Sequence, residues 1–309
     1  MHHRAWCALG FGLAALAVPG AAAYAALSLT RPRRRPLTLT PAALALAYED
    51  VTFPSRDGLA LRGWYLPAQP VEAARSVVIV HGRNGNRADP TIGLVPLARD
   101  LVARGYNVLA FDLRGHGESA AGRLAFGHYE RHDLLGAVDH LIARGRPGRW
   151  VGAVGFSLGA STALLAAADD PRLAAVVADG SFAALRDVLE QHLPTHSHLP
   201  PAFTPLMLLL AKWLLGLDVD AVVPERAVPG IAPRPLLIVH GGEDDTVPVA
   251  HARRLAAANP HATLWLVAGA NHVRAYLTDP QEFLRRVEET FAASNPWRPC
   301  LDTPSPRAL

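Results

Sequence analysis

Short apolar runs alternate with longer amphipathic segments over most of this chain. The apolar runs that we predict as strands lie at 76–81, 107–112, 150–156, 174–179, 235–240 and 262–267. The segments with helical spacing lie at 93–104, 127–144, 158–168, 249–258 and 280–293. Since buried parallel strands are continuously apolar and are joined by helices, the alternation predicts an α/β fold, a mostly parallel sheet with helices on both faces.

A hairpin precedes these strands, and a lid interrupts them. Residues 51–65 alternate around Arg56-Asp57-Gly58, which is typical of two antiparallel strands and brings the predicted sheet to eight strands. Between 181 and 233 the pattern changes to two helices with Pro-rich joints, and the second helix, 203–215, is almost wholly apolar. We therefore predict a small helical lid, inserted into the sheet domain at about 182–232.

The N-terminal segment is apolar and long. Residues 5–30 contain no charged side chain, and at about 1.5 Å per residue a helix of that length exceeds the hydrocarbon core of a bilayer, about 30 Å thick. We predict a transmembrane anchor with a basic flank at 1–35, a linker at 36–48, the main domain at 49–295 and a tail at 296–309. Two alternatives stay open: a signal peptide cleaved near Ala21, Ala22, Ala23 and Ala25, and a buried core helix.

Positive charge gathers around this segment. The formal net charge is +3 and the isoelectric point is about 9.1, but five of the 30 basic residues are Arg4, Arg31, Arg33, Arg34 and Arg35. The positive-inside rule places the following domain on the cytoplasmic side, with export after signal-peptide cleavage as the alternative. The other 25 basic residues are outnumbered by 27 acidic ones, so no nucleic-acid partner is expected.

One motif carries a candidate nucleophile. Gly155-Phe156-Ser157-Leu158-Gly159 has the form G-x-S-x-G, and it lies directly after a predicted strand and at the start of a predicted helix. That position is where a serine is exposed on a sharp, strained turn, and the flanking glycines leave room for neighbouring backbone. Because a serine hydroxyl is a weak nucleophile on its own, Ser157 requires a base, and the base requires an acid.

Later loops supply both partners. Asp244 follows the predicted strand 235–240, and His272 lies between the last predicted strand and the last helix. The chain order Ser, Asp, His matches that of serine hydrolases with a G-x-S-x-G turn. We predict His272 as the base and Asp244 as the carboxylate that orients it. The alternative acids are Asp245, Glu243 and Asp179.

An oxyanion formed at the substrate carbonyl would need two N–H donors. Leu158 would supply one from its backbone, since it begins the helix after Ser157, where the helix dipole favours negative charge. The second would come from the backbone of Arg83, in the loop after His81-Gly82.

Together these stretches resemble the α/β-hydrolase superfamily. The match is nearest to the serine aminopeptidase-like and abhydrolase-domain branch, whose members often carry one N-terminal membrane segment. The supporting motifs span about 50–293 and are Ser55-Arg56-Asp57-Gly58, Gly63-Trp64-Tyr65, Phe111 through Ser119, Gly155 through Gly159, and His240-Gly241 through Val247-Pro248. The resemblance implies structural roles for Asp112 and Arg114, while Arg83 and Asn271 depart from the family's usual residues.

These residues predict a serine hydrolase that cleaves carboxylic esters, lipid-like substrates and acyl thioesters included, through an acyl-enzyme. Its partner would be a small-molecule ester or acyl substrate, and no cofactor is expected, since the chain lacks nucleotide-binding motifs. His192, His196 and His198 cluster without cysteines or paired carboxylates, so no metal is expected there. One alternative is an amidase or aminopeptidase that holds the substrate amine with acids of the lid. The other is a catalytically silent, membrane-tethered binding module. The candidate lid acids are Asp187, Glu190, Asp218 and Asp220.

Overall fold

An eight-stranded sheet forms the centre of the protein. The computed structural model describes residues 20–21, 23–24, 26–68, 75–144, 150–197 and 200–294. The strands are β1 (Glu49–Pro54), β2 (Ala60–Leu66), β3 (Arg75–Val80), β4 (Asn107–Phe111), β5 (Trp150–Phe156), β6 (Leu173–Asp179), β7 (Leu236–Gly241) and β8 (Ala262–Val267). Their order in the sheet is β1-β2-β4-β3-β5-β6-β7-β8. β2 pairs antiparallel with β1 and β4, and the other neighbouring pairs are parallel, which confirms the predicted fold class.

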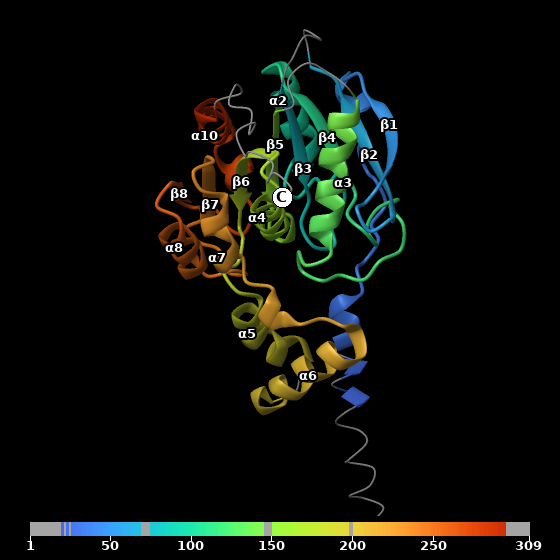
Figure 1. The fold of residues 1–309 in the computed structure, drawn as a ribbon, viewed down its shortest axis with the longest axis vertical. Coiled ribbons are helices and arrows are strands. Elements are labelled where there is room, and N and C mark those ends of the chain that lie inside the picture. The colour runs from blue at the N-terminus through green and yellow to red at the C-terminus, as the bar shows by residue number, and fades with distance from the viewer. Residues whose placement is uncertain are drawn as a thin grey trace, which may run out of the picture.

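Helices cover both faces of this sheet (Figure 1). One face carries α3 (Glu130–Ala143), α4 (Leu158–Asp169) and α8 (Val249–Ala258), and the other carries α2 (Leu94–Ala103) and α10 (Pro280–Ala293). In the central strand β3, Val78 and Val80 join the first core, whereas Val77 and Ile79 join the second. Successive side chains of a strand point to opposite faces, so a strand covered on both sides is apolar throughout.

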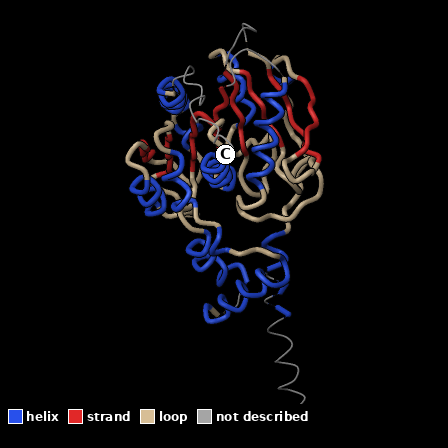
Figure 2. The backbone as a smooth tube through the Cα atoms, in the orientation of Figure 1, coloured by secondary structure: helices blue, strands red, loops and turns tan. Residues whose placement is uncertain are grey.

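The segment that the sequence predicts as a lid lies between β6 and β7. Its main helices are α5 (Leu185–Ser197) and α6 (Thr204–Leu215), followed by the short α7 (Pro224–Ala227). Figure 2 shows that the end of the molecule that carries α5 and α6 consists of helices and loops, without strands. Only one face of α6 packs against the core. Met207 and Leu208 are buried there, while Leu209, Trp213 and Leu214 are exposed.

The connector after the N-terminal segment is docked on the sheet domain. The N–H of Leu124 donates to the carbonyl of Thr30 at 2.8 Å, and the N–H of Arg33 donates to Asn84 Oδ1 at 3.0 Å. The predicted linker is packed as well, with a 3-10 turn at Pro41–Leu44 and apolar side chains against the core under α2. These contacts hold the connector and the linker in one position on the sheet domain.

Much of the predicted anchor lies outside the described residues, which omit 1–19, and the predicted tail does so too. Within the part of the chain that the structure describes, no helix has the length and apolar character needed to cross a bilayer.

Candidate active site

Ser157 occupies a strained turn between β5 and α4. Its φ of 53° and ψ of −113° lie in a region that side chains rarely adopt. The turn is tight: a Cβ on Gly159 would come within 2.2 Å of the Val80 carbonyl oxygen, and one on Gly155 within 2.3 Å of the Gly159 oxygen. Only glycine fits at both positions, which explains why the G-x-S-x-G pattern brackets this serine.

The fold brings Ser157, His272 and Asp244 into one hydrogen-bonded line. His272 Nε2 lies 2.9 Å from Ser157 Oγ, and His272 Nδ1 lies 2.7 Å from Asp244 Oδ2. An ionised carboxylate only accepts hydrogen bonds, so Nδ1 carries the proton and Nε2 is left to accept from the serine hydroxyl. This arrangement is the one that removes a proton from an attacking serine.

Asp244 is buried but well supplied with donors. Its Oδ1 accepts from the N–H groups of Thr246 at 2.9 Å and Val247 at 2.7 Å, and His240 Nε2 lies 3.3 Å from Oδ2. Burial opposes the charge of Asp244, but hydrogen bonds from His272 and Val247 outweigh it and hold the pKa of this carboxyl below its ordinary value. Asp244 is thus kept ionised beside His272.

None of the three alternative acids forms a hydrogen bond with the His272 ring among the described residues. Glu243 is exposed, and Asp245 Oδ2 accepts from Asn271 Nδ2 at 3.1 Å. Asp179, at the end of β6, is fully buried, and neither carboxyl oxygen has a hydrogen-bond partner among the described residues. Burial first, and the charge of Asp244 second, raise the pKa of Asp179 well above its ordinary value, which favours the neutral form of this side chain.

Asn271 contacts both the predicted base and a neighbouring loop, an arrangement that sequence reasoning missed. Its side-chain oxygen accepts from the His272 N–H at 2.5 Å and from the Asp245 N–H at 3.3 Å. It therefore joins the loop that carries His272 to the loop that carries Asp244. The departure from the family's usual residue at this position was the available signal.

Backbone donors lie close to Ser157. Leu158 is the first residue of α4, and the first N–H groups of a helix have no partner within that helix. A Cβ on Gly82 would lie 3.5 Å from the Ser157 Cβ, which places the backbone that leads into Arg83 against the serine. These are the two positions at which the sequence predicts oxyanion donors.

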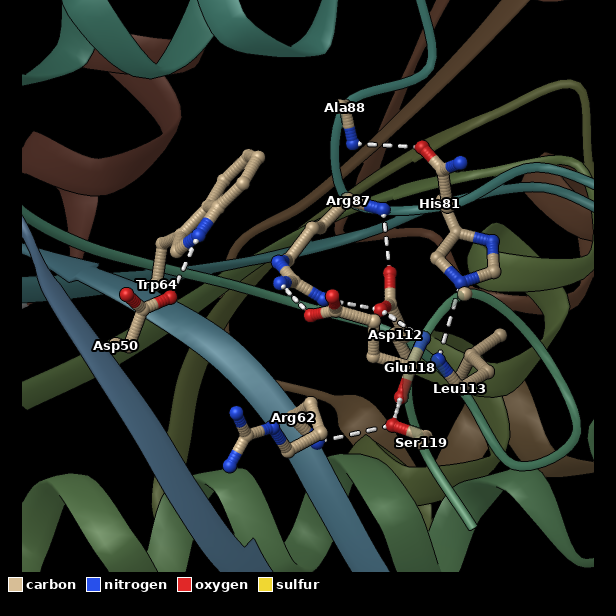
Figure 3. A network of polar contacts seen from close by, with 12 residues as sticks. Asp50, Arg62, Trp64, His81, Arg87, Ala88, Asp112, Leu113, Glu118 and Ser119 are labelled. Carbon is tan, nitrogen blue, oxygen red and sulfur yellow. Dashed lines mark hydrogen bonds and ion pairs between the residues drawn. The ribbon is translucent and has the colours of Figure 1, made fainter. Parts of the chain in front are cut away.

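Buried polar groups hold the loop after β3 in place. His81 Nε2 accepts from the Leu113 N–H at 3.0 Å, and Asp112 accepts from the N–H groups of Arg87 at 2.8 Å and Glu118 at 2.9 Å. Figure 3 shows the Arg87 side chain pointing toward Asp112 and Glu118, with which it forms ion pairs. Asp112 therefore ties the loop to the turn after β4.

Arg114 has a comparable place in the turn after β4. Its guanidinium pairs with Asp133 at 2.6 Å and Asp57 at 2.8 Å. A buried histidine of this turn, His116, accepts from the Asn84 N–H at 3.2 Å, and burial lowers its pKa to about 3. It is neutral and fixes the far end of the same loop.

An apolar pocket of about 330 Å³ opens at Ser157. The apolar side chains that line it include Phe126, Phe182 and the α5 residues Leu185, Val188, Leu189 and Leu193. Arg83 contributes a cation to its wall, where its guanidinium lies 5.8 Å from the Phe126 ring centre. The pocket is suited to an apolar chain whose carbonyl lies at Ser157.

The described residues include no group of three or more side chains able to hold a metal ion. Of the three clustered histidines, His198 lies outside the described residues. His192 is turned instead to the Thr246 carbonyl, with its Nε2 at 2.7 Å from that oxygen.

Glu130 holds the turn that carries Phe126, one of the residues that line the pocket. Helix α3 begins at Glu130, later than the predicted 127, because the Glu130 carboxyl binds the preceding turn: it accepts from the N–H groups of Ala125 at 2.8 Å and Gly127 at 2.7 Å. Phe126, which lines the pocket, lies between them with a φ of 54°. Burial raises the pKa of Glu130 to about 7, and the hydrogen bonds oppose that shift only in part.

This raised pKa predicts a pH-dependent stability. Between the ordinary pKa of 4.5 and about 7 the unfolded carboxyl ionises while the folded one keeps its proton. Unfolding then releases a proton, so stability falls as pH rises through that window, by up to about 3 kcal/mol from this group. We expect the difference in unfolding free energy between wild type and Glu130→Gln to shrink from pH 4.5 to pH 7 in urea titrations. A difference independent of pH would contradict the assignment.

Comparison with known proteins places the chain in a family. The family model described as "alpha/beta hydrolase fold" matches residues 75–205. An uncharacterised protein of Mycobacterium tuberculosis is 30% identical over 247 residues, 78% of each chain, and the uncharacterised protein YfhR of Escherichia coli is 28% identical over 80% of this chain and 82% of its own. The chain belongs to the α/β-hydrolase superfamily.

A solved structure agrees with that placement. An esterase of Pyrococcus furiosus superposes with a TM-score of 0.69 at 27% identity, covering 85% of this chain and 99% of that enzyme.

Proposed function

We propose that this protein is a serine hydrolase that cleaves carboxylic esters through an acyl-enzyme. The observation that carries the proposal is the line from Ser157 Oγ through His272 to Asp244, with distances of 2.9 and 2.7 Å. The esterase activity named for the Pyrococcus furiosus structure supports the same reaction class.

The reaction runs in two halves. His272 Nε2 takes the hydroxyl proton as Ser157 Oγ bonds to the ester carbonyl carbon, and Asp244 stabilises the imidazolium that results. The backbone N–H groups of Leu158 and Arg83 hold the oxyanion. When the tetrahedral intermediate collapses, His272 returns the proton to the leaving alkoxide. Water then attacks the acyl-enzyme by the same route, releasing the acid and restoring Ser157.

The pocket favours esters over substrates with a free amine. An aminopeptidase would place a carboxylate near the substrate amine, but the pocket-lining residues that the structure describes include no acid. The four lid acids are instead paired with cations: Asp187 with Arg254, Glu190 and Asp220 with Arg186, and Asp218 with Lys212.

A matched substrate pair tests the proposal. We expect purified wild-type protein to hydrolyse p-nitrophenyl esters, with kcat/KM rising from acetyl to octanoyl as the acyl chain fills the apolar pocket. Aminoacyl p-nitroanilides, which carry an amide bond and a free amine, serve as the control and should be poor substrates. Hydrolysis of the anilides without the esters would establish amide chemistry in its place.

We propose further that residues 5–30 anchor the enzyme in a membrane, with the domain on the cytoplasmic side. The support is the uncharged length of the segment and the four arginines that follow it. Digestion of the domain by a protease added outside intact cells would contradict this orientation.

A further inference from the structure

Exposed apolar side chains gather at one end of the molecule. Five of the large exposed apolar residues of the described chain lie on two segments, the helical turns before the connector and α6, and these residues are Tyr24, Leu27, Leu209, Trp213 and Leu214. We name this set the apolar tip. Figures 1 and 2 show both segments at the same end, beyond the sheet.

The exposure at this tip is large. Trp213 is 81% exposed and Tyr24 is 74% exposed, so most of the surface of each residue contacts solvent. Single exposed apolar residues are common, but a group of them at one end indicates a surface that another apolar phase covers.

Four arginines follow Leu27 in the sequence, and a fifth, Arg83, contacts Leu29; we name this group the arginine collar. Its members are Arg31, Arg33, Arg34, Arg35 and Arg83, and none of them forms an ion pair with another described residue. The connector that carries four of them is bound to the domain, since Asn86 Nδ2 donates to the carbonyls of Arg35 and Pro36, each at 3.1 Å. The positive charge therefore stays directly behind the apolar residues.

The pocket at Ser157 adjoins both the segment before the connector and the arginine collar. Leu29, in the last turn before the connector, lines the pocket together with Arg83 of the collar. The Arg83 guanidinium donates to the Leu29 carbonyl at 3.4 Å. Leu29 and Ser157 thus line one cavity, and Leu29 is two residues from Leu27 of the tip.

We infer that the apolar tip inserts into the surface of a lipid bilayer containing anionic lipids, with the arginine collar at the level of the phosphates. The apolar side chains would enter the acyl region, and the exposed guanidinium groups of Arg31, Arg33 and Arg35 would meet negative headgroups. The Arg34 guanidinium instead donates to the carbonyls of Gly117 at 2.9 Å and Ser119 at 2.7 Å, which holds this part of the connector on the domain. Continuity favours lipid as the occupant, because Tyr24 and Leu27 of the tip belong to the uncharged segment 5–30. A second copy of the chain fits less well, since it would bring two positively charged collars together.

This docking deepens the proposed function and rests on it for its substrate. The enzyme would draw long-chain esters from the leaflet that its tip enters, so that lipid-like esters are the substrate class. Soluble short esters would reach Ser157 without the tip.

Depth measurement on the full chain tests the docking. In a Cys7→Ala, Cys300→Ala background, a fluorophore is attached at Trp213→Cys, and the protein is reconstituted into phosphatidylcholine vesicles with phosphatidylglycerol that carry doxyl-labelled lipid. We expect lipid-borne quenching at position 213, weaker without phosphatidylglycerol, and none at the control Leu266→Cys on β8. Equal quenching at both positions, or none at 213, would overturn the inference. Shielding of the label in vesicle-free detergent solution that increases with protein concentration would establish a dimer in its place.

Activity separates the docking from the chemistry. We expect the triple variant Leu209→Ser, Trp213→Ser, Leu214→Ser to lose about ten-fold in kcat/KM on a long-chain ester embedded in vesicles. Its activity on a soluble short ester should stay at the wild-type level, because these side chains lie outside the pocket. An equal loss on both substrates would count against docking. If wild type hydrolyses neither ester, the proposed function fails, while the quenching result still decides the docking.

Discussion

Replacing Ser157 by alanine is expected to lower kcat for ester hydrolysis by at least about 10⁴-fold, because the atom that forms the acyl-enzyme is lost. His272→Ala should cost about as much, since the serine hydroxyl then has no base. The double variant should be hardly worse than either single one, as groups that act in one step are not additive.

The measurement is single-turnover and steady-state hydrolysis of the same p-nitrophenyl ester by the three variants, with near-ultraviolet circular dichroism to verify that each is folded. Additive losses in the double variant would mean that Ser157 and His272 act in separate steps. Wild-type activity in Ser157→Ala would place the nucleophile elsewhere.

Asp244→Asn is expected to lower kcat by about 10³- to 10⁴-fold. The asparagine NH₂ group would oppose the Nδ1–H of His272 and favour the tautomer that leaves no acceptor for the serine proton. The two backbone N–H groups that Asp244 Oδ1 binds should leave the loop itself in place.

Asp179→Asn is the matched control, since it makes the same change in the neighbouring buried carboxyl. Because burial favours the neutral form of Asp179, a neutral amide should change kcat by less than about three-fold. A loss at Asp179 equal to that at Asp244 would move the orienting role to the end of β6, one of the alternatives that the sequence leaves open.

The sheet was predictable because its signals are local. β5 is apolar throughout and β3 is apolar from Val77 to Val80, which a strand covered on both faces requires, and each is followed by a helix with clear spacing. Ser157, Asp244 and His272 could be selected for a related reason. Each follows a predicted strand, and the carboxyl ends of parallel strands meet at one edge of the sheet.

Other features depend on contacts between distant parts of the chain. The bridge from Asn271 to Asp245 and the raised pKa of Asp179 follow from how loops after different strands pack, which residue spacing does not encode. The docking of the connector on the loop after β3 is of the same kind. Apolar pattern predicted α6 as a helix, but it could not tell which of its apolar residues face the core and which face outward.

Labelling with a fluorophosphonate probe tests most directly the central claim that Ser157 is an activated nucleophile. The full-length protein is treated with the probe and the modified peptide is located by mass spectrometry, with Ser157→Ala and His272→Ala in parallel. The account predicts one adduct on Ser157, absent from Ser157→Ala and strongly reduced in His272→Ala. No adduct on folded wild-type protein, or an adduct that persists unchanged in His272→Ala, would contradict it.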